Sequence, residues 1–207
     1  MNLSQLCRIA VSVVMLCVGP WAFADDSKGF GPIINFQDLS TGFQPCPTCD
    51  PTGDLAGVGV TYSSRGYTFS YTPEPGEPFP VGLFVVGRFW PFNNGTNALL
   101  ANSVNALTTL KRDDNRRFSL VAIDLAETNG PNDFPTIVVF QGTTASGQLV
   151  SQQFTLDNVT GFQRFHFPDR FKNLISVQWM QGDNVSNNIH MFDNVVVVAT
   201  EFRPRTD

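Results

Sequence analysis

The feature that most constrains the fold is a period-two alternation of apolar and polar residues along most of the chain. Tyr67, Phe69 and Tyr71, for example, alternate with Thr68 and Ser70. This period places alternate side chains on opposite faces of a β-strand, whereas a helix needs a period near 3.6. The pattern predicts strands at 33–39, 58–62, 67–71, 81–89, 106–111, 119–125, 136–140, 149–156, 162–167, 175–181 and 190–199.

The same pattern predicts how these strands assemble. Residues 195–198 are apolar without interruption, so the strand at 190–199 is expected to be central and covered on both faces. Turn sequences such as those at 64–66 and 145–147 separate the runs. About a dozen short strands are typical of an antiparallel sandwich or jelly roll. We expect one all-β domain at 25–207, a two-sheet antiparallel β-sandwich of jelly-roll type.

The first 24 residues have the features of a secretory signal peptide. Arg8 precedes an apolar run at 9–18, and Gly19 ends that run ahead of an Ala-Phe-Ala site at 22–24. The run is about ten residues long, shorter than the ~20 that a spanning helix needs. We therefore expect cleavage after Ala24, secretion into the periplasm or the extracellular space, and no membrane span in the mature protein.

Composition argues against a nucleic-acid binder. The chain has 13 Lys and Arg against 18 Asp and Glu, with a formal net charge of −5. A general nucleic-acid binder needs a basic face. We expect no nucleic-acid partner.

The order of several segments resembles a known group of proteins. The segments are FSLVAIDLAE at 118–127, TIVVFQG at 136–142 and FDNV at 192–195. They resemble a large group of secreted bacterial jelly-roll domains that often precede a PEP-CTERM sorting signal. The likeness spans roughly 33–198 and implies the outline of a carbohydrate-binding jelly roll. The sorting signal itself is absent, because Pro-Glu-Pro at 73–75 has no spanning segment after it.

Cys46 and Cys49 form the one cysteine pair after the signal peptide, and three interpretations compete. A thioredoxin-like site needs a helix after the first cysteine, but Asp-Pro-Thr-Gly at 50–53 predicts a turn. A zinc site needs four ligands. A local disulfide, formed after export, is favoured.

The resemblance also implies a structural calcium site. Jelly-roll binding modules commonly hold such an ion between their first and last strands, which nominates Asp38, Asp193 and Asn194 as ligands. The alternative is that Asp193 and Asn194 bond a neighbouring loop backbone, as short polar side chains do. No other cofactor is expected.

Aromatic and amide side chains gather at 90–97 and nominate a sugar-binding surface. The candidate residues are Trp90, Phe92, Asn93, Asn94 and Asn97. Rings stack on sugar faces and amides bond hydroxyls, although large aromatic residues more often bury at the core edge.

Trp179 is different, because it falls in phase with Ile175 and Val177, so we expect it in the core.

No catalytic motif stands out. His166 and His190 both lie inside predicted strands, and the few glutamates do not form a glycosidase motif. The leading hypothesis is a secreted, non-catalytic β-sandwich that binds an extracellular ligand, with glycan as the candidate, or that contributes to the cell-surface matrix. The alternative is an exported hydrolase of unknown substrate, which would need a histidine and a carboxyl, or two carboxyls, in one cleft.

Overall fold

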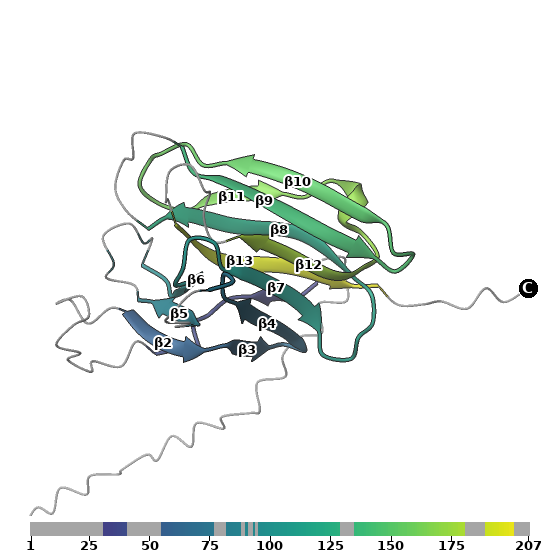
Figure 1. The fold of residues 1–207 in the computed structure, drawn as a ribbon, viewed down its shortest axis with the longest axis horizontal. Helices are drawn as coiled ribbons and strands as arrows, with labels where there is room; N and C mark the ends of the chain where they lie inside the picture. The colour runs from purple at the N-terminus through teal and green to yellow at the C-terminus, as the bar shows by residue number, and fades with distance from the viewer. Residues whose placement is uncertain are drawn as a thin grey trace, which may run out of the picture.

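The computed structural model describes residues 31–40, 55–76, 82–87, 90, 93, 95–128, 135–180 and 189–200. In these ranges the chain folds into thirteen strands and one short 3-10 turn (Figure 1). The elements are β1 (Ile33–Ile34), β2 (Leu55–Gly59), β3 (Thr61–Ser64), β4 (Tyr67–Thr72), β5 (Leu83–Val86), β6 (Ala98–Ala101), β7 (Leu107–Arg112), β8 (Phe118–Glu127), β9 (Ile137–Thr144), β10 (Leu149–Thr155), β11 (Gln163–His166), η1 (Asp169–Phe171), β12 (Leu174–Met180) and β13 (His190–Ala199).

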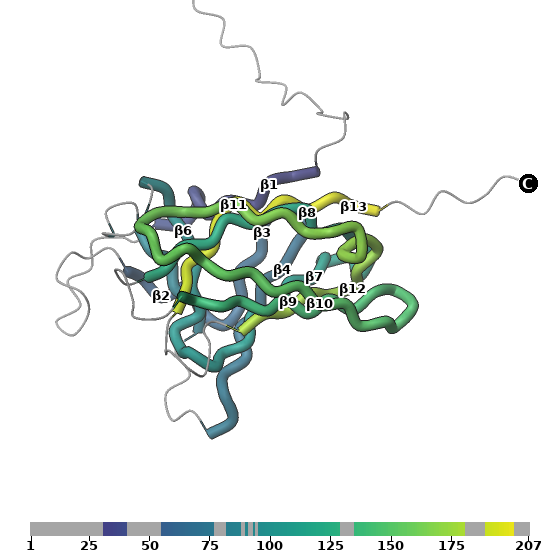
Figure 2. Tube along the Cα trace, turned by 90° about the horizontal axis from the view of Figure 1, so that it is seen from above, coloured from purple at the N-terminus to yellow at the C-terminus, as the bar shows by residue number. Residues whose placement is uncertain are grey.

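The strands form two facing layers, and all their pairings are antiparallel. One layer has the order β2-β5-β6-β13-β8-β11 and the other β3-β4-β7-β12-β9-β10. Figure 2 shows β8, β11 and β13 on one side of the sandwich and β9, β10 and β12 on the other. A residue pair between Leu174 and Phe118 links the two layers. The expected all-β, two-sheet antiparallel sandwich is confirmed.

Aromatic rings fill the space between the layers. Trp179 on β12 is 1% exposed, and its ring centroid lies 5.1 Å from that of Phe140, 5.2 Å from that of Phe192 and 6.4 Å from that of Phe69. These rings come from β9, β13 and β4, so the cluster joins both sheets. Such contacts add ~0.5–1.5 kcal/mol each beyond area burial. The prediction that Trp179 lies in the core is confirmed.

Strand β13 is central, as its uninterrupted apolar sequence predicts. It pairs with β8 along one edge from His190 to Ala199. Its other edge is shared, because β6 pairs at Phe192 and β1 pairs at Val195 and Val196. The change of partner falls between these pairs, in the middle of the strand.

The first predicted strand, 33–39, is much shorter in the structure. Strand β1 ends at Ile34, and the chain turns at 37–38, where the Leu39 N–H donates to the Phe36 carbonyl at 3.1 Å. Asp38 thus lies in a turn rather than at the end of a strand.

Two further differences have local causes. Ile175 was expected to point inward with Trp179 but is exposed, because the register with β9 shifts between Leu174 and Ser176 and reverses the phase. Strand β6 was not predicted, since its four residues are all apolar and show no alternation.

Several predictions concern residues outside the described ranges. These are the signal peptide at 1–24, the Cys46–Cys49 pair, and Phe92 and Asn94 of the proposed sugar surface. Among the residues that the structure does describe, none belongs to a helix long and apolar enough to cross a membrane.

Candidate functional site

Trp90, the proposed sugar platform, lies half-buried against the outer face of the sheet that contains β5, β6, β13 and β8. Its ring packs against a small apolar cluster formed by Val86, Ala98, Leu100, Ala126 and Met191. Ala98 and Leu100 alternate along β6 with Leu99 and Ala101 of the main core, which places this cluster on the opposite face. The indole N–H donates to the Thr128 carbonyl at 2.9 Å. Trp90 therefore has a structural role on this face.

The two described asparagines of the same segment also bond the protein itself. Asn93 donates its amide to the Gly87 carbonyl at 2.9 Å and accepts from the Thr96 N–H at 3.3 Å. Asn97 donates to the Leu39 carbonyl at 2.7 Å. These bonds fix the loop before β6. Sugar binding by this segment stays a prediction.

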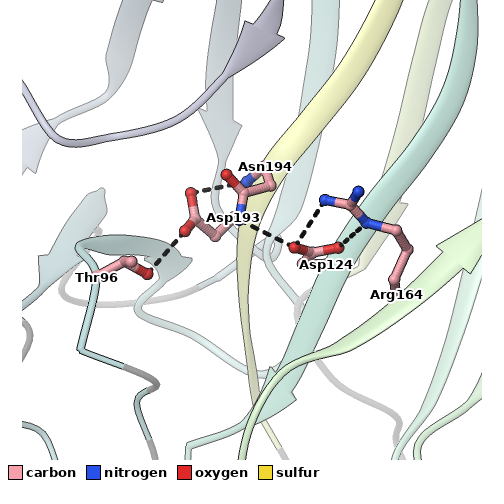
Figure 3. A network of polar contacts seen from close by, with 5 residues as sticks. All are labelled: Thr96, Asp124, Arg164, Asp193 and Asn194. Carbon is pink, nitrogen blue, oxygen red and sulfur yellow. Dashed lines mark hydrogen bonds and ion pairs between the residues drawn. The ribbon is translucent and has the colours of Figure 1, made fainter.

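Asp193 lies where β13 changes partner from β6 to β1 (Figure 3). The ladder to β8 shifts after this residue, and Asn194 has a positive φ of 47°. The Asp193 carboxylate accepts hydrogen bonds from the Asn194 N–H at 2.7 Å and the Thr96 hydroxyl at 2.9 Å, and also from the Phe36 N–H. One carboxylate thus joins the end of β1 to the loop before β6.

Asp124 and Arg164 continue this polar network across the sheet. Arg164, Asp124 and Asp193 face one another in register on β11, β8 and β13. Arg164 donates to both oxygens of Asp124, at 2.7 and 3.1 Å, and Asn194 donates its amide to Asp124 at 2.9 Å. Figure 3 shows the resulting chain from Thr96 to Arg164. A bidentate arginine–carboxylate pair is among the stronger polar contacts.

Burial makes the Asp193 carboxyl a weaker acid than an exposed aspartate. It is fully buried, and this burial raises the pKa of its carboxyl from 3.8 to about 6. The Asp124 carboxylate raises the pKa further, while the hydrogen bonds from Asn194 and Thr96 lower it.

The proposed calcium ligands have separate partners. Asp38 accepts from the Tyr62 hydroxyl at 2.7 Å, and Asn194 directs its amide N–H to Asp124. In the described ranges, no group of three or more His, Cys, Asp or Glu side chains is placed to hold a metal ion. Asp193 makes the backbone bonds that the alternative hypothesis predicts. Calcium binding stays a prediction.

A histidine and a carboxyl do meet in register, but they are buried. His190 on β13 faces Glu127 on β8, and their exposed fractions are 0% and 5%. Burial raises the pKa of Glu127, whose Oε1 accepts from the Asn158 N–H at 3.1 Å. This bond ties the loop after β10 to the end of β8. His166, in contrast, is exposed on β11.

An open groove of about 660 Å³ lies at one end of the sandwich, where β9 turns into β10 (right-hand end of Figure 1). It is lined by Arg117, Thr144, Ala145, Ser146, Gln148, Val150, Asp169, Arg170, Lys172 and Asn173. Three separate parts of the chain supply these residues: the residue before β8, the β9–β10 hairpin, and η1 with the turn before β12. The volume falls within the ~300–1,000 Å³ typical of ligand sites.

Backbone hydrogen bonds hold the groove walls in place. Within the hairpin, the Thr144 N–H donates to the Gln148 carbonyl and the Gly147 N–H donates to the Thr144 carbonyl, each at 2.9 Å. Gly147 has a φ of 82°, which glycine adopts without strain. The Ala145 N–H donates to the Asn173 carbonyl at 2.9 Å and joins the hairpin to the opposite wall. The groove is therefore pre-formed.

Sequence reasoning did not identify this groove. The turn at 145–147 was predicted, and Arg170 and Lys172 are visible as charges next to a strand. Local sequence does not predict that Arg117 lies close to the hairpin at 144–148 or to residues 169–173. That proximity follows from the antiparallel order of β8, β9 and β12.

Comparisons with known proteins give matches at the level of solved structures. No protein-family model matches the chain, and no curated protein does. The C-terminal domain of a chitobiase from Bacteroides fragilis is 14% identical, with a TM-score of 0.38 over 69% of this chain and 99% of that one. A family 32 carbohydrate-binding module of NanJ from C. perfringens, in complex with galactose, is 12% identical, with a TM-score of 0.36 over 64% of this chain and 93% of that one. A family 11 carbohydrate-binding module from Clostridium thermocellum is 9% identical, with a TM-score of 0.30 over 85% of this chain and 100% of that one. The fold class rests on the strand pairing of the chain itself.

Proposed function

We propose that this protein is an exported, non-catalytic domain that binds an extracellular polysaccharide in the groove beside the β9–β10 hairpin. The observation that carries the proposal is the groove itself: about 660 Å³, open, pre-formed and lined mainly by polar side chains. Polysaccharides are long and highly hydroxylated, so they suit an open groove with many hydrogen-bonding groups.

The chemistry of the lining supports binding rather than hydrolysis. Asp169 is the one acid among the ten lining residues, and it pairs with Lys172 at 2.8 Å. Glycoside hydrolysis ordinarily uses two carboxyl groups on either side of the scissile bond. The buried Glu127 and His190 do not line the groove.

The groove is also better suited than the segment around Trp90. The side chains of Gln148 and Asn173 are exposed in the groove, whereas the amides of Asn93 and Asn97 bond backbone carbonyls. The exposed Ser146 hydroxyl also lines the groove and bonds the Thr144 hydroxyl at 2.9 Å. The signal-like sequence at 1–24 supports export. N-terminal sequencing of exported protein should therefore begin at Asp25.

A screen of immobilised polysaccharides against residues 25–207 tests the proposal, with a steric block as its key variant. Ala145→Trp adds a large ring at an exposed groove position whose backbone bond is unaffected. Val159→Trp is the matched control, because Val159 is 61% exposed beyond the other end of β10.

We expect wild type and Val159→Trp to bind at least one polysaccharide, and Ala145→Trp to lose binding while keeping the wild-type melting temperature. Retained binding by Ala145→Trp, or no binding by wild type, would overturn the proposal.

A further inference from the structure

We infer that the groove selects negatively charged polysaccharides, those that carry carboxylate or sulfate groups; this inference rests on the function proposed above. Three of the lining residues, Arg117, Arg170 and Lys172, are cations, and Asp169 is the one acid among them. The whole chain has the opposite balance, with a net charge of −5. The groove is therefore a local positive site on an acidic protein, which attracts an anionic ligand.

Arg117 is placed to contact such a ligand. Its backbone is fixed, because its carbonyl accepts from Arg112 Nη1 at 3.0 Å and from the Thr200 N–H at 3.1 Å. Its side chain is exposed, and no residue in the described part of the chain pairs with its guanidinium. A guanidinium presents donors in a planar fork that matches a carboxylate or sulfate.

Arg170 supplies a second cation in a fixed position. Its Nε donates to the Ser151 carbonyl at 3.0 Å, and its Nη2 donates to Gln152 Oε1 at 2.5 Å. Both acceptors are uncharged, so the positive charge of Arg170 is not neutralised by them. The two bonds hold the guanidinium against β10, beside the groove.

Lys172 can exchange its present partner for a ligand. It pairs with Asp169 at 2.8 Å, and the exposed fractions of the two side chains are 57% and 92%. An ion pair this exposed is worth little, at ~0–1 kcal/mol. An incoming carboxylate can therefore compete with Asp169 for the lysine.

The overall charge favours a polysaccharide over a nucleic acid as the anion. A nucleic acid carries a dense line of phosphates and needs an extended basic surface. Here three cations line the groove, and the net charge of −5 repels a densely charged polyanion elsewhere on the surface. A glycan with spaced charges and hydroxyls fits the mixture of cations with Ser146, Gln148 and Asn173.

Matched pairs of polysaccharides test the inference by affinity electrophoresis and calorimetry. Polygalacturonate is compared with its methyl ester, and sparsely sulfated dextran with dextran, so that the members of each pair share a sugar backbone and differ in their charged groups. Single-stranded DNA serves as a further polyanion. The variants are Arg117→Gln and Lys172→Gln, together with Ala145→Trp. Arg116→Gln is the matched control, because it removes the same charge one residue away, outside the groove, from a side chain that is 77% exposed.

We expect binding to at least one charged polysaccharide, and its neutral counterpart to bind at least ~10-fold more weakly. Arg117→Gln should weaken binding to the charged form by about tenfold, Lys172→Gln by less, and Arg116→Gln by no more than about twofold. Raising NaCl from about 20 to about 500 mM should weaken binding of the charged form.

The outcomes separate this inference from the proposed function. Equal binding of charged and neutral members of a pair, lost in Ala145→Trp, would leave the groove function in place and overturn the charge selection. Equal loss in Arg116→Gln and Arg117→Gln, or equal binding of single-stranded DNA, would also overturn it. If Ala145→Trp binds every ligand as wild type does, the groove function fails as well.

Discussion

Replacing Asp193 with Asn should remove a specific part of the pH dependence of stability. Burial raises the pKa of this carboxyl from 3.8 to about 6, so the native state disfavours its ionised form. An acid with a raised native pKa contributes its full stability below pH 3.8 and loses that contribution as the pH rises through 6. The difference between the two values corresponds to about 3 kcal/mol in the free energy of unfolding. Asn cannot ionise, and the Thr96 hydroxyl can accept from its amide instead of donating.

Urea unfolding of wild type and Asp193→Asn between pH 4 and 8 measures this effect. The free energy of unfolding of wild type, relative to the variant, should fall by about 2–3 kcal/mol over this range. Taking the difference cancels contributions from other groups such as Glu127, whose pKa is also raised by burial. Asp113→Asn, at an exposed carboxylate, is the matched control. If the difference in unfolding free energy between wild type and Asp193→Asn stays constant from pH 4 to 8, the Asp193 carboxyl does not have a raised pKa in the native state.

Three other substitutions test separate parts of the structure. Gly31→Ala places a Cβ in collision with the Val197 carbonyl oxygen, so it should force β1 off β13 and lower the free energy of unfolding in urea by ~2–4 kcal/mol. A variant as stable as wild type would contradict this close packing of Gly31 on β13. Trp90→Ala should cost about 2 kcal/mol through its lost packing and indole hydrogen bond, yet leave polysaccharide binding unchanged; lost binding in a folded variant would favour Trp90 as the sugar platform. Replacing Cys46 and Cys49 with Ser should leave the fold intact, because a four-residue disulfide loop adds only ~2 kcal/mol; two titratable thiols in exported wild-type protein would exclude the disulfide.

The alternation of side chains accounts for what the sequence could predict of the fold. Strands β4, β7, β10 and β12 lie close to the ranges expected from apolar residues at every second position. The burial of β13 on both faces follows from its uninterrupted apolar run, because such a strand is stable only where both faces are covered.

Where the pattern failed, the backbone departs from a regular ladder. The bulges after Leu174 and after Asp193 reverse the phase of the side chains, and nothing in the alternation marks them. Asp193 and Asn194 were nominated as calcium ligands, which stays a prediction. Their observed role is to bridge the gap between β1 and β6, which depends on strand order and not on local sequence.

The groove could not be predicted from local sequence either, because distant segments form it. A turn at 145–147 was predicted, but its closeness to Arg117 and Lys172 follows from how the sheets are paired. The segment at 90–97 was nominated because its aromatic and amide residues are adjacent in sequence. In the structure, its described amides bond the protein, and the exposed polar groups of the groove come from distant segments.

Polysaccharide binding in the groove is tested by mapping which residues a ligand contacts. Amide chemical shifts of residues 25–207 are recorded by two-dimensional NMR while a galacturonate oligomer is added. We expect the shift changes to concentrate at Ser146, Gln148, Lys172 and Asn173, and Ala145→Trp to abolish them. Shifts concentrated around Trp90, or no shifts at saturating ligand, would contradict it.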